Sequence, residues 1–184
     1  MKKLLLIPTV LLFVSCGSNF EVNQENVANT YKGEDRSLNL TDENINGFVN
    51  LNGYMSGTEV NNIYLQENNI EWLDISDYED LWTLDISNNN IRFIWDLKLP
   101  LTIRHLNLSW NILTSLKWIE KYTKLKTLDI SNNNITDDEI DISPLENLLY
   151  INMDNNPDMS DEKINATKEF NAIYLSTNPK PFSE

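Results

Sequence analysis

The nonapeptide TLDISNNNI occurs twice in this chain of 184 residues, at 83–91 and again at 127–135. The two copies are 44 residues apart, and halfway between them the chain reads HLNLSWNIL at 105–113. The apolar residues of this middle copy, and its Asn111, fall on the same slots as those of the identical copies. The chain therefore has a 22-residue repeat, which predicts an array of stacked, similar units.

The same frame extends in both directions along the chain. Upstream lie NIYLQENNI at 62–70 and a weaker first copy, SLNLTDENI at 37–45, in which Glu43 replaces the asparagine. Downstream lie YINMDNNPDM at 150–159 and AIYLSTNP at 172–179. An apolar residue leads every copy after the first: Val60, Leu81, Ile103, Leu125, Leu148 and Phe170.

These copies resemble the leucine-rich repeat, whose signature is L-x-x-L-x-L-x-x-N-x-L, and the period is similar to that of the bacterial, internalin-like class. The resemblance covers residues 38–179. It implies an α/β fold, a short horseshoe-shaped solenoid with one parallel β-strand per repeat. The convex side is then mostly 3₁₀ or extended, with low helix content. No strong cap is evident at either end of the array.

The spacing of the apolar residues supports this architecture. In L-x-L, alternate side chains face opposite sides of a strand, so that the two apolar residues point into the core. The inward pairs are Ile63/Leu65, Leu84/Ile86, Leu106/Leu108 and Leu128/Ile130. Between the strands, apolar residues recur every three positions, which favours 3₁₀ turns or short extended segments. Examples are Leu113, Leu116, Ile119, Tyr122 and Leu125.

An asparagine follows each strand at a fixed place. Its amide can satisfy buried backbone groups in the turn and in the next repeat, and each such group left unsatisfied costs about 1–3 kcal/mol. We therefore predict a structural rather than a catalytic role for this asparagine ladder, which comprises Asn68, Asn89, Asn111, Asn133, Asn156 and Asn178.

The first residues have the pattern of an export signal. Lys2 and Lys3 precede an apolar run from Leu4 to Val14, which is shorter than the roughly 20 residues of a membrane-spanning helix. The run ends in FVSC, which resembles the lipobox of bacterial lipoproteins, although Phe13 departs from the usual leucine.

This resemblance implies a lipoprotein signal peptide at residues 1–15 and acylation of Cys16, for example with palmitate. Residues 16–36 would then be the lipidated cysteine with a polar tether or a small N-terminal cap, and residues 37–184 the repeat domain. We expect a lipid-anchored protein of the bacterial cell envelope, with the outer membrane favoured. Cys16 is the only cysteine in the chain, which excludes an intramolecular disulfide.

The side chains between the inward-facing residues are expected to form the concave surface, where proteins of this family bind partners. Tyrosine and tryptophan are common anchors at protein interfaces, and aspartates can make charge contacts. The candidate partner-binding residues are Tyr64, Asp85, His105, Asn107, Trp110, Asp129, Tyr150, Asn152, Asp154 and Tyr174. A solvated face without a dedicated partner remains the alternative, because Asp85 and Asp129 belong to the duplicated unit.

Charge and residue types limit the other functions. Without Lys2 and Lys3 the chain has 12 basic and 28 acidic residues, a formal charge of −16, which argues against nucleic acid and against membrane contact other than through the lipid. We find no catalytic motif, no cofactor motif and no His/Cys metal cluster, and the acidic clusters at 74–80 and 136–143 lack the spacing of an EF-hand.

The leading hypothesis is thus a non-catalytic, lipid-anchored module that binds a protein partner. One alternative is a structural envelope spacer without a specific ligand. The least favoured is a hydrolase that acts on envelope glycans through acidic residues, since such an enzyme needs a carboxyl of raised pKa in a cleft.

Overall fold

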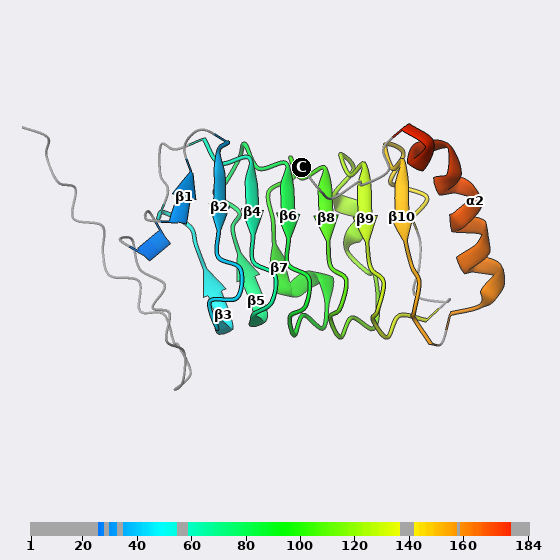
Figure 1. Cartoon of the computed structure of the whole chain (residues 1–184), viewed down its shortest axis with the longest axis horizontal. Coiled ribbons are helices and arrows are strands. Elements are labelled where there is room, and N and C mark those ends of the chain that lie inside the picture. The colour runs from blue at the N-terminus through cyan, green and yellow to red at the C-terminus, as the bar shows by residue number, and fades with distance from the viewer. Residues whose placement is uncertain are drawn as a thin grey trace, which may run out of the picture.

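A computed structural model describes residues 26–27, 30–32, 35–54, 59–136, 142–157 and 159–177, which form one solenoid capped by a helix (Figure 1). The predictions for the signal peptide, for the acylation of Cys16 and for Asn178 concern residues outside these ranges. No helix within the described ranges is both long and apolar enough to span a membrane.

The concave side is a seven-stranded sheet in the order β1-β2-β4-β6-β8-β9-β10. All neighbouring strands are parallel except β1, which pairs with β2 in the antiparallel sense. The strands are β1 (Tyr31–Lys32), β2 (Ser37–Asn39), β4 (Asn62–Tyr64), β6 (Thr83–Asp85), β8 (His105–Asn107), β9 (Thr127–Asp129) and β10 (Tyr150–Asn152). The predicted parallel solenoid with one strand per repeat is confirmed.

The register of this sheet follows the repeat. Leu84 pairs with Ile63 on one side and with Leu106 on the other, and the same row continues at both ends of the array. Its members are Leu38, Ile63, Leu84, Leu106, Leu128 and Ile151, all fully buried. Apolar side chains at one slot thus stack on each other, and each repeat buries its apolar side only against its neighbours.

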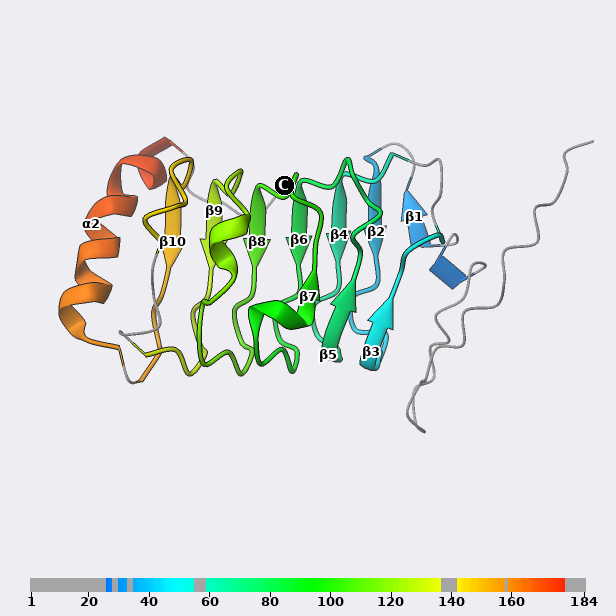
Figure 2. The ribbon, with the colours of Figure 1, turned by 180° about the vertical axis from the view of Figure 1, so that it is seen from behind.

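The convex side consists of short extended and 3₁₀ segments, as predicted (Figure 2). The first repeats contribute a small parallel sheet of β3 (Asn46–Asn50), β5 (Asn69–Asp74) and β7 (Leu97–Lys98). The 3₁₀ turns η1 (Ile94–Asp96) and η2 (Ile119–Lys121) follow further along the chain. The apolar residues spaced by three are buried here, and Tyr122 is the largest fully buried side chain among the described residues.

The asparagine ladder connects consecutive repeats. Asn111 Nδ2 donates to the carbonyl oxygens of Leu108 and Ser109 in its own turn, at 3.1 and 3.3 Å, and to that of Ile86 in the repeat before, at 3.0 Å. Its Oδ1 accepts the backbone N–H of Ile91, also in the repeat before, at 2.9 Å. Equivalent bonds are made by Asn68, Asn89, Asn133 and Asn156.

The direction of these bonds differs from our expectation. Each asparagine completes the preceding repeat and not the next one, because its side chain points back toward the turn already formed. This direction explains Glu43 in the first copy. An asparagine at position 43 would have no preceding parallel repeat to complete, since β2 pairs on that side only with the short antiparallel β1.

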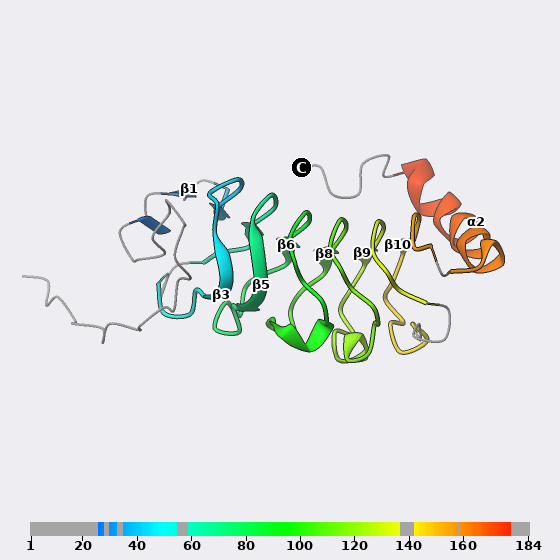
Figure 3. The same cartoon turned by 90° about the horizontal axis from the view of Figure 1, so that it is seen from below.

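The segment predicted to form the last repeat does not continue the array of strands. Residues 172–179 were expected to begin a strand, but residues 161–177 form the helix α2 (Asp161–Thr177), which lies against β10 at the end of the array (Figure 3). Tyr174 therefore belongs to a helix and not to the concave sheet. Phe170, expected to be a buried leading residue, is exposed.

Local signals explain the start of this helix. The Ser160 hydroxyl oxygen accepts the backbone N–H of Lys163 at 3.4 Å, as an N-cap residue does, and Asp161 and Glu162 place negative charge in the first turn. The I-x-L pattern at 173–175 is as compatible with a helix as with a strand, and the helix start decides between them.

Asn171 on α2 takes the place of a further strand. Its side-chain Oδ1 accepts the backbone N–H of Ile151 at 2.8 Å, and its Nδ2 donates to the carbonyl oxygen of the same residue. These are the two groups of β10 that would pair with the next parallel strand. Because an unpaired edge promotes association with other chains, the buried Asn171 ends the sheet where it would otherwise remain open.

Candidate binding surface

The predicted concave columns are present on the sheet. In β4, β6, β8 and β10 the central residue of the strand is buried and its two neighbours are half-exposed, which gives a polar, partly hydrated surface. Tyr64, Asp85, Asn107, Asp129 and Asn152 lie side by side in one row through the register of the strands.

Most acidic and amide side chains of this row are engaged within the protein. Asp85 Oδ1 accepts the backbone N–H and the hydroxyl of Ser87, at 3.0 and 2.6 Å. Asp129 makes the same pair of bonds with Ser131, and Asn107 does so with Ser109. Each side chain thus closes the turn after its own strand, which is an ordinary use of Asp and Asn.

Neighbouring members of the row are also joined to each other. Asn107 Nδ2 donates to Asp85 Oδ2 at 3.0 Å, and Asn152 Nδ2 donates to Asp129 Oδ2 at 3.1 Å. Both oxygens of each aspartate therefore accept hydrogen bonds from neutral groups inside the solenoid. Asp85 and Asp129, predicted to make charge contacts with a partner, thus stabilise the turns and connect the strands of the solenoid.

The remaining concave candidates are less committed to turns. His105 Nδ1 lies 2.9 Å from the hydroxyl oxygen of Thr127 on the next strand. Burial raises the pKa of the Tyr150 hydroxyl, with smaller contributions from the nearby carboxylates of Asp129 and Asp154. Tyr150 therefore stays a neutral hydrogen-bond donor at physiological pH, and Tyr64 offers a second half-exposed ring on β4.

Trp110 lies in an unusual backbone position. The fourth residue after the centre of each strand is left-handed in every described repeat, a conformation that favours Asn, Asp and Gly. The members of this column are Asp42, Glu67, Asn88, Trp110, Asn132 and Asn155, with φ between 53° and 60°. Trp110 has φ 55°, and its side chain is 63% exposed. A bulky ring here gains little burial to offset its backbone strain.

The identical copies on either side of Trp110 show what the fold itself requires. At three positions of TLDISNNNI the middle copy carries a different type of residue: His105 for Thr, Trp110 for Asn and Ile112 for Asn. Its other changes are conservative: Asn107 for Asp at the end of the strand, and Leu for Ile at the buried positions 108 and 113. Ile112 is 45% exposed. The middle repeat thus places two apolar side chains, Trp110 and Ile112, just after the C-terminal end of β8, on the side where the chain leaves the concave sheet.

Trp110 was predicted from the sequence as a binding residue, whereas Ile112 was not. The signal was available, because the comparison of the middle copy with its two identical neighbours reveals both residues. Tyr174, by contrast, was assigned wrongly and joins no concave row. No group of three or more His, Cys, Asp or Glu within the described ranges could hold a metal ion.

Comparisons with known proteins agree with this architecture. Residues 124–148 match the family model described as Leucine Rich Repeat. A search among curated proteins found no match, whereas 43 chains of solved structures match. One of these is the crystal structure of an internalin (inlF) from Listeria monocytogenes, with a TM-score of 0.50 and 23% sequence identity. The match covers 59% of this chain and 32% of that chain, so it spans about a third of the internalin.

Three independent features now agree on the fold. The strands are in register at the repeat period, an asparagine from each repeat completes the one before, and one repeat matches the family model while the array superimposes on an internalin. The chain therefore folds as a leucine-rich-repeat solenoid of the internalin type.

Proposed function

We propose that this chain is a non-catalytic module that binds a protein partner through one side of its concave sheet, the side formed by the C-terminal ends of the strands. Trp110 is the anchor of this site. Leucine-rich repeats typically serve protein-protein interaction, because stacked repeats present extended surfaces. The observation that carries the proposal is the exposed Trp110 in a left-handed position that the identical flanking copies fill with asparagine. Local strain of this kind is usually retained where it serves a function.

The composition of this edge fits a small hot spot. Trp110 and Ile112 supply apolar area, and the half-exposed Asn107 at the end of β8 supplies polar groups. A tryptophan surrounded by polar residues is the typical anchor of a protein interface. Because the solenoid is short, the contact area is modest, which favours a weak or multivalent interaction.

We expect Trp110→Asn to raise the free energy of unfolding by about 0.5–1 kcal/mol and to abolish partner binding. The stability rises because asparagine adopts the left-handed conformation more readily than tryptophan. A photo-crosslinking amino acid in place of Ile112 reports the binding in cells, and the same probe in place of Glu79, an exposed residue of the convex side, is the control.

A discrete adduct from position 112, absent from position 79 and lost in Trp110→Asn, supports the proposal and yields the partner for mass spectrometry. An adduct that persists in Trp110→Asn would place the anchor elsewhere. Absence of an adduct at both positions in the folded, expressed protein would favour the structural spacer.

The proposal includes attachment to the envelope through an acylated Cys16, supported by the FVSC sequence after an apolar run. Such an anchor requires at least two acyl chains for stable membrane binding. Incorporation of labelled palmitate into the parent chain, and its loss in Cys16→Ser, is the expected result. Equal labelling of the two chains would exclude this anchor.

A further inference from the structure

Charged residues are separated along the solenoid. Residues 37–91 contain ten Asp or Glu and no Lys or Arg. Residues 127–162 also contain ten Asp or Glu and no Lys or Arg. Residues 92–126, between them, contain seven of the 14 basic residues and two of the 28 acidic ones. A chain of net charge −14 thus carries a positive segment about two repeats wide, with acidic repeats on both sides.

Five of these cations, together with Trp118, run across the solenoid rather than along it. Lys117, Lys121 and Lys124 are exposed in the convex and returning parts of one repeat, and Lys126 is exposed just before β9. Arg104 precedes β8 in the neighbouring repeat, and its carbonyl oxygen accepts the backbone N–H of Lys126 at 2.7 Å. We call Arg104, Lys117, Trp118, Lys121, Lys124 and Lys126 the basic belt.

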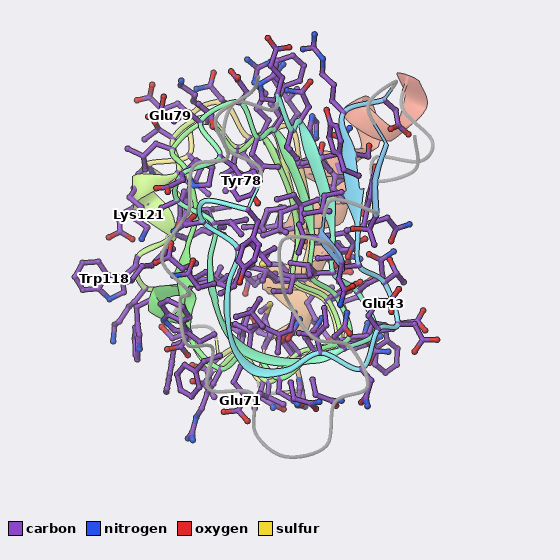
Figure 4. All side chains as sticks on the ribbon, turned by 90° about the vertical axis from the view of Figure 1, so that its left-hand side faces the viewer. Glu43, Glu71, Tyr78, Glu79, Trp118 and Lys121 are labelled. Atoms are coloured by element: carbon purple, nitrogen blue, oxygen red, sulfur yellow. The ribbon has the colours of Figure 1, made fainter. Side chains whose placement is uncertain are left out.

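The belt begins on the side opposite the concave sheet. Trp118 and Lys121 project from the same side of the solenoid, and Glu43 lies on the other side (Figure 4). Because Trp110 lies on the edge where the chain leaves the sheet, and Lys126 on the edge where the chain enters it, the belt does not overlap the hot spot around Trp110.

Four of the five cations of the belt are not neutralised by a described acidic residue. Within the described part of the chain, Arg104, Lys121, Lys124 and Lys126 form no ion pair with a carboxylate. The Arg104 guanidinium lies over the ring of Trp82 at 4.7 Å, and Lys121 Nζ lies over Tyr122 at 4.8 Å. In a chain so rich in Asp and Glu, unpaired cations gathered in one place favour an anionic ligand.

A second observation at the belt points to a ligand. Trp118 is 54% exposed and left-handed, with φ 79° at the start of η2. It is a large aromatic ring whose backbone is strained and whose side chain is not buried, directly beside Lys117. Tryptophan next to cations supplies apolar contact area and cation–π contacts in recognition surfaces.

We propose that the basic belt is a second binding site, for an acidic and partly apolar segment of a partner protein that lies across the solenoid in extended conformation. The acidic repeats on both sides of the belt limit which anionic ligands can bind there. A nucleic acid, a long acidic glycan or an anionic membrane would extend over these repeats and be repelled by them. A peptide can place its carboxylates on the belt and neutral residues elsewhere.

Binding of a fluorescent peptide of alternating glutamate and tyrosine to the full chain tests this assignment, with alternating glutamine and tyrosine as the control peptide. Three variants are compared with the parent: Lys121→Gln/Lys124→Gln/Lys126→Gln, the same positions changed to Arg, and Trp118→Asn. All four positions are exposed, so folding should be preserved. Asparagine at 118 suits the left-handed backbone and should not lower stability.

We expect the Gln variant to weaken binding about tenfold at low salt, and the Arg variant to bind like the parent, since only the first removes charge. Trp118→Asn should weaken binding about threefold without loss of stability. Equal binding by the parent and the Gln variant, or unchanged binding by Trp118→Asn, would overturn the proposal. Tighter binding to a sulfated polysaccharide or to phosphatidylglycerol vesicles would overturn it in favour of a glycan or a membrane.

Discussion

Replacing Asn111 by alanine is expected to lower the free energy of unfolding by about 4 kcal/mol, because its side chain makes four hydrogen bonds to buried backbone groups and each unsatisfied group costs about 1–3 kcal/mol. Two of these bonds reach the preceding repeat, at Ile86 and Ile91. The substitution therefore weakens the interface between repeats as well as one turn.

Chemical denaturation followed by circular dichroism measures this loss. Asn90→Ala is the matched control, because Asn90 is an exposed asparagine beside the ladder in the preceding repeat, and the change should stay within about 0.5 kcal/mol. A loss below about 1 kcal/mol for Asn111→Ala would show that water or a local rearrangement satisfies the freed groups, and that the ladder contributes little.

The second large effect is expected at the end of the sheet. Asn171→Ala should destabilise the protein by about 3 kcal/mol, because the N–H and the carbonyl oxygen of Ile151 both lose their partner in a buried place. It should also promote self-association, because the edge of β10 becomes available for pairing with another chain.

Sedimentation velocity detects the association, and denaturation detects the loss of stability. Asn165→Ala is the matched control on the same helix: Asn165 is exposed, and alanine is the better helix former, so this variant should be monomeric and slightly more stable. A monomeric Asn171→Ala variant of parental stability would mean that α2 covers β10 by packing alone.

The sequence predicted the strands because two requirements coincide at each of them. Leu84 and Ile86 must both face the core, and the asparagine after them must reach the turn, so the register of β6 against β8 admits no shift by one residue. The apolar residues spaced by three on the convex side were predictable in the same way, because each of them must also face the core. These positions are fixed by local pattern and by the repeat together.

The C-terminal end was not predictable from the repeat alone. Ile173 and Leu175 continue the frame, yet the helix start at Ser160 and the need to close β10 prevail. The sequence pattern shows which residues recur. A terminal unit, however, has a neighbour on one side only, so its structure depends on the strand edge that it must cover.

The candidate surface was predictable in its position but not in its use. Asp85 and Asp129 lie on the concave side as expected, but the hydroxyls of Ser87 and Ser131 already occupy their oxygens. Hydrogen bonds between side chains depend on rotamers that a sequence pattern does not specify. Trp110 was recognisable because it departs from the residues that its neighbours carry at the same slot.

The direction of the asparagine ladder has a consequence for synthesis on the ribosome. Each repeat receives its buried amide from the repeat that follows, so no repeat is complete until about one further period has left the exit tunnel. Nascent structure then grows in one direction and always lags one unit behind translation. The last described strand has no following repeat, and there Asn171 of α2 instead bonds the backbone N–H and carbonyl oxygen of Ile151 that a further strand would take.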